Sequence, residues 1–232
     1  MEDRFNFLKQ RYLSLKEEIE NACSKTGRNL SEVQLIAVSK KHPAQDIAYL
    51  YQLGHTVFGE NYVQEALDKQ KQLNDLNLNW HFIGSLQTNK VKFVVGNFTV
   101  IHTVDREKLV SSLAKQCQKK NYCQKILIQV NVGREPQKAG VLPEGLEKLT
   151  EIVLDQKGLK LEGLMTLPPY TENKHQIRKY FSFLRELKEK LEQKFSIQLK
   201  ELSMGMTHDF KEAIMEGATM IRIGTKIFGP RE

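Results

Sequence analysis

The chain of 232 residues has few features of a cross-linked, metal-bound or membrane-anchored protein. It contains three cysteines, an odd number, and Cys117 and Cys123 lie without a histidine at ligand spacing. The sequence therefore predicts neither a disulfide framework nor a zinc site. No apolar run approaches the length of a membrane span, and residues 1–4 lead into an amphipathic pattern without a signal-peptide core. These absences predict a cytoplasmic protein with no membrane partner.

The charge is also not concentrated in one tract. The formal net charge is +7, but the lysines of a segment such as 179–194 alternate with glutamates, as on a solvated helix face. Basic residues are not interleaved with aromatic ones, so we expect no nucleic-acid partner. With 40% hydrophobic and 27% charged residues, the chain can bury one sizeable core. We therefore expect one domain over residues 1–232.

No linker or low-complexity stretch interrupts a regular alternation of strand and helix patterns. Residues 1–27 begin the chain with an amphipathic helix, predicted over 3–25 and ended by Gly27, which we expect to pack on the domain that follows. The predicted strands are residues 33–39, 56–58, 80–83, 98–103, 125–131, 159–164, 199–203 and 219–223. Helical patterns lie between them, near 44–53, 61–74, 87–95, 106–120, 143–156, 173–194 and 209–217.

Eight strands that alternate with helices favour the α/β class and a single (β/α)8 TIM barrel. An open, doubly wound sheet is the alternative. It is disfavoured because no Gly-x-Gly-x-x-Gly motif follows the first predicted strand.

The first predicted strand ends on a lysine. The apolar run Leu35–Val38 is followed by Ser39 and Lys40, with His42 and Pro43 just beyond. Barrel enzymes keep their chemistry at the carboxyl ends of the strands. A lysine amine that loses its proton there can attack a carbonyl to form a Schiff base. Two alternatives fit the same segment: Lys40 is an ordinary solvated lysine, or Lys41 points into the barrel in its place.

The last two predicted strands are followed by small and hydroxyl-bearing residues. Residues 203–207 read Ser-Met-Gly-Met-Thr and residues 223–225 read Ile-Gly-Thr, at the place where barrels frequently hold a phosphate. Glycine lets the backbone approach an anion. Ordinary turns would use the same residues. Together with Lys40, a phosphate clamp would supply the two attachment points of pyridoxal phosphate (PLP).

Six runs of residues resemble one family, the pyridoxal phosphate homeostasis proteins (the YggS/PROSC family), in its order and spacing from about 30 to 230. They are Ala37–Lys40, Phe58–Glu65, Trp80–Gly84 with Leu86–Lys90, Gly163–Thr166, Leu202–Met206, and Ile221–Thr225 with Phe228–Gly229.

The resemblance implies a PLP barrel of fold-type III, similar to the N-terminal domain of alanine racemase. It implies a covalent aldimine at Lys40, and it assigns the phosphate to the groups around five residues. These are Ser203, Met206, Thr207, Gly224 and Thr225. Position 207 is a threonine where the family more often has serine, which keeps the hydroxyl.

The same resemblance places Arg222 opposite the pyridine nitrogen. A guanidinium stays protonated, so it disfavours a protonated ring and makes the cofactor a poor electron sink. Asn61 and His81 would line the mouth of the site, although each could instead be a satisfied core polar group.

The function implied is reversible binding of PLP and a part in vitamin B6 homeostasis, without strong catalytic activity. Racemases of this fold use a second base from a C-terminal domain, and nothing after Phe228 encodes one. The alternatives are a fold-type III enzyme, such as an amino-acid racemase or lyase, and a Schiff-base aldolase without cofactor. We expect PLP, other B6 vitamers and PLP-dependent apo-enzymes as partners, and a monomeric chain.

Overall fold

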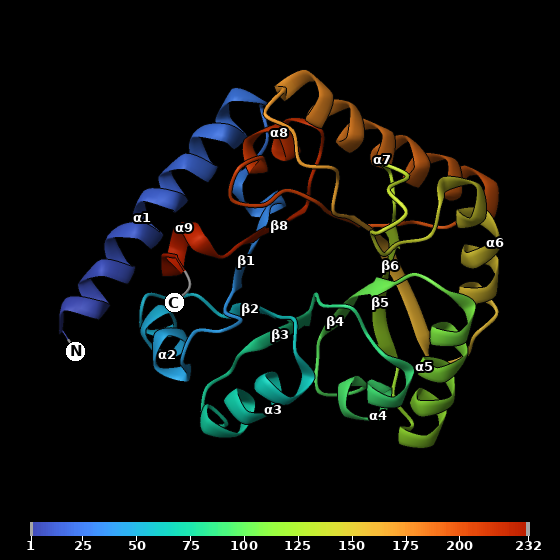
Figure 1. The fold of residues 1–232 in the computed structure, drawn as a ribbon, viewed down its shortest axis with the longest axis horizontal. Coiled ribbons are helices and arrows are strands. Elements are labelled where there is room, and N and C mark those ends of the chain that lie inside the picture. Colours follow the sequence, from blue (N-terminus) through green and yellow to red (C-terminus); the bar gives the residue numbers. More distant parts are fainter. Residues whose placement is uncertain (1, 231–232) are drawn as a thin grey trace.

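Eight parallel strands close into a barrel in the order β1 to β8 in the computed structural model, which describes residues 2–230 (Figure 1). The strands are β1 (Gln34–Val38), β2 (Val57–Glu60), β3 (Asn79–Phe82), β4 (Val100–Val104), β5 (Gln124–Val130), β6 (Leu159–Thr166), β7 (Glu201–Ser203) and β8 (Met220–Ile223). β8 pairs with β1, with Ile36 opposite Arg222, and this pairing closes the barrel. The predicted (β/α)8 fold is confirmed.

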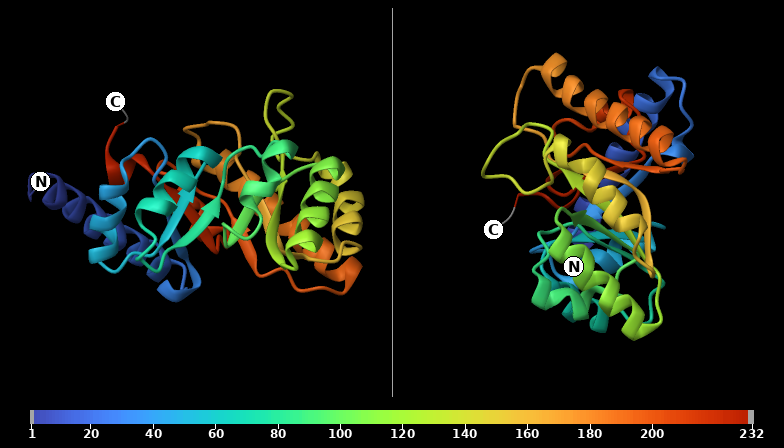
Figure 2. Two further views of the ribbon diagram at one scale, coloured as in Figure 1. Left: turned by 90° about the horizontal axis from the view of Figure 1, so that it is seen from below. Right: turned by 90° about the vertical axis from the view of Figure 1, so that its right-hand side faces the viewer.

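Helices cover the outside of the barrel. The longer ones are α1 (Glu2–Lys25), α2 (Ala44–Gln52), α3 (Val63–Gln72), α5 (Glu107–Lys120), α6 (Pro143–Leu154) and α7 (Lys174–Phe195). The short ones are α4 (Val91–Val94), α8 (Phe210–Met215), α9 (Thr225–Phe228) and the 3-10 turns η1 (Leu30–Glu32) and η2 (Thr88–Lys90). The predicted N-terminal helix is α1, which contacts α2, α8 and α9 and lies at the opposite end of the molecule from α6 (Figure 2). Within residues 2–230, no helix combines the length and the apolar character that a bilayer crossing needs.

The apolar core has two parts that lie on opposite sides of the barrel wall. A large cluster joins alternate strand residues, such as Ala37 and Phe58, to the buried faces of the helices. A small cluster comes from strand residues only, among them Ile36, Leu127 and Met165, and it fills part of the barrel interior. Since both faces of the strands are buried, the strands read as nearly continuous apolar runs, which is why the sequence reveals them.

Two short segments differ from the sequence prediction. The helix predicted over 87–95 is the turn η2 followed by the single turn α4, because Val95 is extended and Gly96, at φ 81°, redirects the chain toward β4. Helix α9 was not predicted, since four residues are too few to show a helical period.

Candidate functional site

A cavity of about 270 Å³ opens at the carboxyl ends of the strands. It is lined by residues that follow β1, β2, β3, β6, β7 and β8, by the last residue of β1 and by one residue within β8. They are Val38, Lys40, Asn61, Ile83, Leu167, Met206, Thr207, His208, Arg222, Gly224 and Thr225. The cavity thus brings together all the site residues expected from the sequence except His81 and Ser203.

The two lysines after β1 have different surroundings. Lys40 is half-buried and lines the cavity. Lys41 adopts a left-handed backbone conformation, at φ 64°, and lines a separate cavity with His42 and Arg4. The turn therefore directs Lys40 and not Lys41 toward the site.

A buried cluster of charges lies directly behind Lys40. The Lys69 ammonium donates to the carbonyl oxygen of Ser39 at 2.7 Å, to Glu60 Oε1 at 2.7 Å and to Glu65 Oε1 at 2.6 Å. The Ser39 hydroxyl also donates to Glu60 Oε1, at 2.7 Å, and the backbone N–H of Lys41 donates to Glu65. Burial raises the pKa of Glu60, and the Lys69 charge opposes that rise. The residues on both sides of Lys40 are thereby fixed.

Sequence reasoning missed Lys69. Its only signal was the i, i+4 spacing from Glu65 on one helix, which is typical of exposed ion pairs. The side chain is in fact 5% exposed.

Asn61 contributes an acceptor to the cavity. Its Oδ1 is buried and has no hydrogen-bond partner among residues 2–230. The loop that carries it lies tightly against the end of β3, since a Cβ on Gly84 would stand 2.1 Å from the Asn61 carbonyl oxygen. A buried acceptor without a partner in a cavity wall is a group that a ligand could satisfy.

The turns after β7 and β8 supply two hydroxyls. Thr207 is half-buried and Thr225 is exposed, and within the described chain neither hydroxyl makes a hydrogen bond to protein. Gly205, at φ 92°, has no room for a side chain, because a Cβ would approach that of Ala213 to 2.6 Å. Gly224 brings its backbone against Val38, where a Cβ would stand 3.3 Å from the Val38 carbonyl oxygen. Both turns thus leave small groups and free hydroxyls at the cavity.

Arg222 lies under the cavity, within β8, and is 4% exposed. Its Nη1 donates to Ser203 Oγ at 2.6 Å and its Nη2 donates to the Thr166 carbonyl oxygen at 2.8 Å. Burial lowers the pKa of Arg222 to about 10, while the nearby Asp209 carboxylate raises it, so the guanidinium remains charged at neutral pH. Ser203, expected as a phosphate ligand, is instead placed behind Arg222, where its hydroxyl also contacts His102 Nδ1 at 2.9 Å.

His81 lies well below the mouth at which it was expected. It is the third residue of β3, points into the barrel, and contacts His102 with its Nδ1, 2.9 Å from His102 Nε2. It lines a different cavity, of about 310 Å³, at the amino ends of the strands. Ile83, two residues later, takes the place at the mouth.

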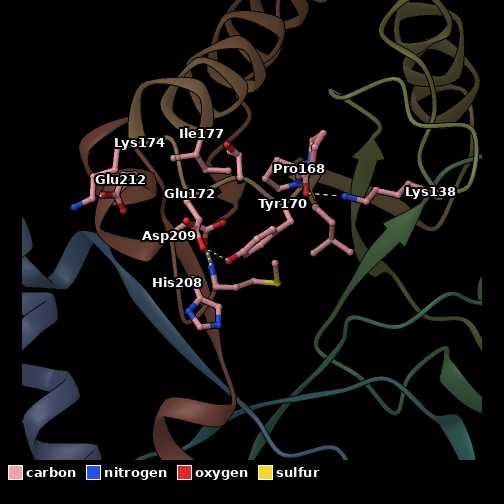
Figure 3. Close-up of a pocket in the computed structure, with 13 residues that line it drawn as sticks. Lys138, Pro168, Tyr170, Glu172, Lys174, Ile177, His208, Asp209 and Glu212 are labelled. Carbon is pink, nitrogen blue, oxygen red and sulfur yellow. Dashed lines mark hydrogen bonds and ion pairs between the residues drawn. The ribbon is translucent and has the colours of Figure 1, made fainter.

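A larger cavity, of about 540 Å³, adjoins the first and shares Leu167, Met206 and His208 with it. Figure 3 shows His208 and Asp209 on one side and Lys138 on the other. Lys138 Nζ is held by the Pro168 carbonyl oxygen at 2.8 Å. The site is therefore wider on the side of β6 and α7 than sequence reasoning indicated.

Comparison with known proteins identifies the family. The model of the alanine racemase N-terminal domain matches residues 14–232. A pyridoxal phosphate homeostasis protein of Aquifex aeolicus is 47% identical over 223 residues, covering 96% of this chain and 98% of that protein. One of Haemophilus influenzae is 41% identical over 220 residues, with coverages of 94% and 93%. The chain belongs to the pyridoxal phosphate homeostasis protein family.

A solved structure of similar sequence supports the same assignment. PipY of Synechococcus elongatus, solved with PLP bound, is 38% identical and superimposes with a TM-score of 0.82. The match covers 91% of the present chain and 99% of the PipY chain. The predicted family resemblance is confirmed.

Proposed function

We propose that this protein binds PLP in the cavity at the carboxyl ends of the strands, with Lys40 as the covalent attachment point. The observation that carries the proposal is the convergence on this cavity of one amine, one charged guanidinium and two hydroxyls, the hydroxyls making no hydrogen bond to protein within residues 2–230. When bound, the cofactor supplies an aldehyde that reacts reversibly with a primary amine. Lys40 provides that amine, and the Lys69 cluster fixes the backbone on both sides of it.

The turns after β7 and β8, which form the other wall of the cavity, could bind the phosphate of PLP. The hydroxyls of Thr207 and Thr225 can donate to phosphate oxygens, and Gly224 and Met206 bring backbone groups close to them. The acceptor at Asn61 Oδ1 suits a hydroxyl or N–H of the ligand. The Thr207 and Thr225 hydroxyls and Asn61 Oδ1, which have no protein partner among residues 2–230, thus match the groups that PLP presents.

The position and charge of Arg222 favour PLP binding over strong catalysis by the bound PLP. Because the guanidinium only donates hydrogen bonds and stays charged, it would keep a pyridine nitrogen beside it unprotonated. A ring in that state stabilises carbanions poorly. We therefore infer that the protein is a cytoplasmic monomer that holds PLP without strong catalysis. We infer also that it accepts related B6 vitamers and releases PLP to PLP-dependent apo-enzymes.

One observation favours the alternative, a fold-type III enzyme such as a racemase or lyase. His208 lines the cavity together with Lys40, so a second proton-transfer group lies in the site.

The two functions can be separated with the purified protein. We expect titration of the cofactor-free protein with PLP to give a visible absorption band that saturates at one equivalent. We expect the loaded protein, incubated with amino acids in deuterium oxide, to leave the Cα proton in place. No band would contradict PLP binding, whereas rapid Cα exchange would favour the enzyme.

A further inference from the structure

Four polar side chains form a continuous hydrogen-bonded chain through the barrel interior. His81 Nδ1 lies 2.9 Å from His102 Nε2, His102 Nδ1 lies 2.9 Å from Ser203 Oγ, and Arg222 Nη1 donates to the same oxygen at 2.6 Å. All four are at most 4% exposed. Arg222 ends this hydrogen-bonded chain at the cavity in which we propose that PLP binds. His81 ends it at the cavity of about 310 Å³ at the other end of the barrel.

The protons of this chain can be counted. Arg222 can only donate. Burial lowers the pKa of His81 to about 4, with a contribution from the Lys125 charge, and burial lowers the pKa of His102 well below its ordinary value. Each imidazole is therefore neutral at pH 7 and carries a single N–H, and Ser203 contributes a single O–H.

Only two arrangements give every contact one proton. In the first, the Ser203 hydroxyl donates to His102 Nδ1, His102 Nε2–H donates to His81 Nδ1, and His81 Nε2–H faces the lower cavity. The second reverses each donor, so Ser203 Oγ accepts from both Arg222 and His102. Any mixture of the two leaves the His81–His102 or the His102–Ser203 contact with no proton or with two.

The first arrangement is the more complete. In the second, the Ser203 hydroxyl proton has no acceptor among residues 2–230, since the only hydrogen-bond partners of that oxygen there, side chain or backbone, are Arg222 and His102. A buried donor left without an acceptor is costly. A hydroxyl that donates to one neighbour also becomes a better acceptor for another, so the first arrangement strengthens the bond from Arg222.

We propose that His102 and His81 are positioning residues for Arg222: both in the Nε2–H tautomer, they make Ser203 a donor toward His102 and a fixed acceptor for the guanidinium. The importance of Arg222 rests on the proposed function, but the proton arrangement does not. His102 acts on the PLP cavity through Ser203 and Arg222, and His81 fixes the tautomer of His102 from below.

The tautomers can be read directly in the cofactor-free protein. Long-range ¹H–¹⁵N NMR of histidine-labelled protein distinguishes a protonated Nε2 from a protonated Nδ1. We expect His81 and His102 to be neutral and protonated at Nε2 at pH 7. An Nδ1–H tautomer at His102 would overturn the proposal, whether or not the protein binds PLP.

A matched set of variants tests the positioning role. His102→Asn keeps an acceptor for the Ser203 hydroxyl, whereas His102→Leu removes it. His55→Leu is the control. His55 is also a buried imidazole, but its partners are Tyr12 and the Val57 carbonyl oxygen, which are not part of the hydrogen-bonded chain.

We expect His102→Leu to shift the absorption maximum of bound PLP and to weaken PLP binding about tenfold, with His102→Asn closer to the parent. His55→Leu should lower stability without a spectral shift. Equal spectra and affinities for His102→Leu and the parent, or an equal shift in His55→Leu, would contradict the proposal. If His102→Leu does not fold, the NMR tautomers of His81 and His102 still decide.

Discussion

The two walls of the cavity in which we propose that PLP binds are supported in different ways. Behind Lys40 lies an ionic cluster in which the Lys69 ammonium contacts two carboxylates and a carbonyl oxygen. Behind Arg222 lies a chain of neutral imidazoles and a hydroxyl. The cluster is at the end of the strands, where a helix can supply a counter-ion, whereas the chain is inside the barrel. A cationic side chain at the cavity can thus be supported by charges that fix the backbone beside it, as at Lys40, or by neutral groups that bond its head group, as at Arg222.

The largest expected effect on PLP binding comes from removing the lysine in front of the ionic cluster. Lys40→Ala should weaken PLP binding by about a hundredfold or more, because the covalent attachment is lost. Lys41→Ala, one residue further along, should bind normally, since Lys41 lines a different cavity. Absorption titration measures both, and equal affinity of Lys40→Ala and the parent would exclude Lys40 as the attachment point.

The ionic cluster should be more important for stability than the neutral chain. Lys69→Met leaves Glu60 and Glu65 without their cation, and breaking a buried ion pair costs about 3 to 5 kcal/mol. Lys71→Met, at an exposed position of the same helix, is the control and should change the free energy of unfolding by less than about 0.5 kcal/mol. Urea unfolding measures this difference. A loss below about 1 kcal/mol in Lys69→Met would show that the cluster adds little.

The neutral imidazoles should make the protein sensitive to acid. Burial lowers the pKa values of His55 and His81 to about 4 and that of His102 well below its ordinary value, so the unfolded chain binds more protons than the folded one. Stability should therefore fall as the pH falls from about 6.5 to about 4, by up to about 3 kcal/mol for a residue such as His55. Unfolding at pH 7.5 and 4.5 tests this, and His55→Phe should reduce the difference. An equal pH dependence in that variant would contradict the assignment.

The smallest effects on PLP binding are expected at the two hydroxyls proposed to bind the phosphate. Thr207→Val and Thr225→Val each remove one hydroxyl that has no protein partner in the described chain, and each should weaken PLP binding by about 1 to 3 kcal/mol. Thr88→Val, in the turn η2 away from the cavity, should have no effect. Unchanged affinity in both site variants would refute the proposed phosphate clamp.

The difference between the walls also explains what the sequence could predict. The strands follow from apolar runs, and Lys40 follows from its place at the end of one of them. The supporting groups were harder to find. Lys69 lies in a helix pattern that resembles a solvated face, and only the fold shows that it is buried.

The orientation of the barrel residues was not predictable for a related reason. Because both faces of a parallel strand are buried, alternation of polar and apolar residues gives no sign of which side chains point inward. The family resemblance implied His81 at the mouth and Ser203 beside the phosphate, whereas the structure places both side chains in the interior. His102, between them, gave no signal in the sequence.

Borohydride reduction of the loaded protein, followed by peptide mapping, will show whether Lys40 holds PLP. Reduction converts the reversible bond to a stable one, so the modified residue keeps its label through proteolysis. We expect one label per chain, on the peptide that contains Lys40. A label on another lysine, such as Lys69 or Lys138, or no label in a protein that has bound PLP, would contradict it.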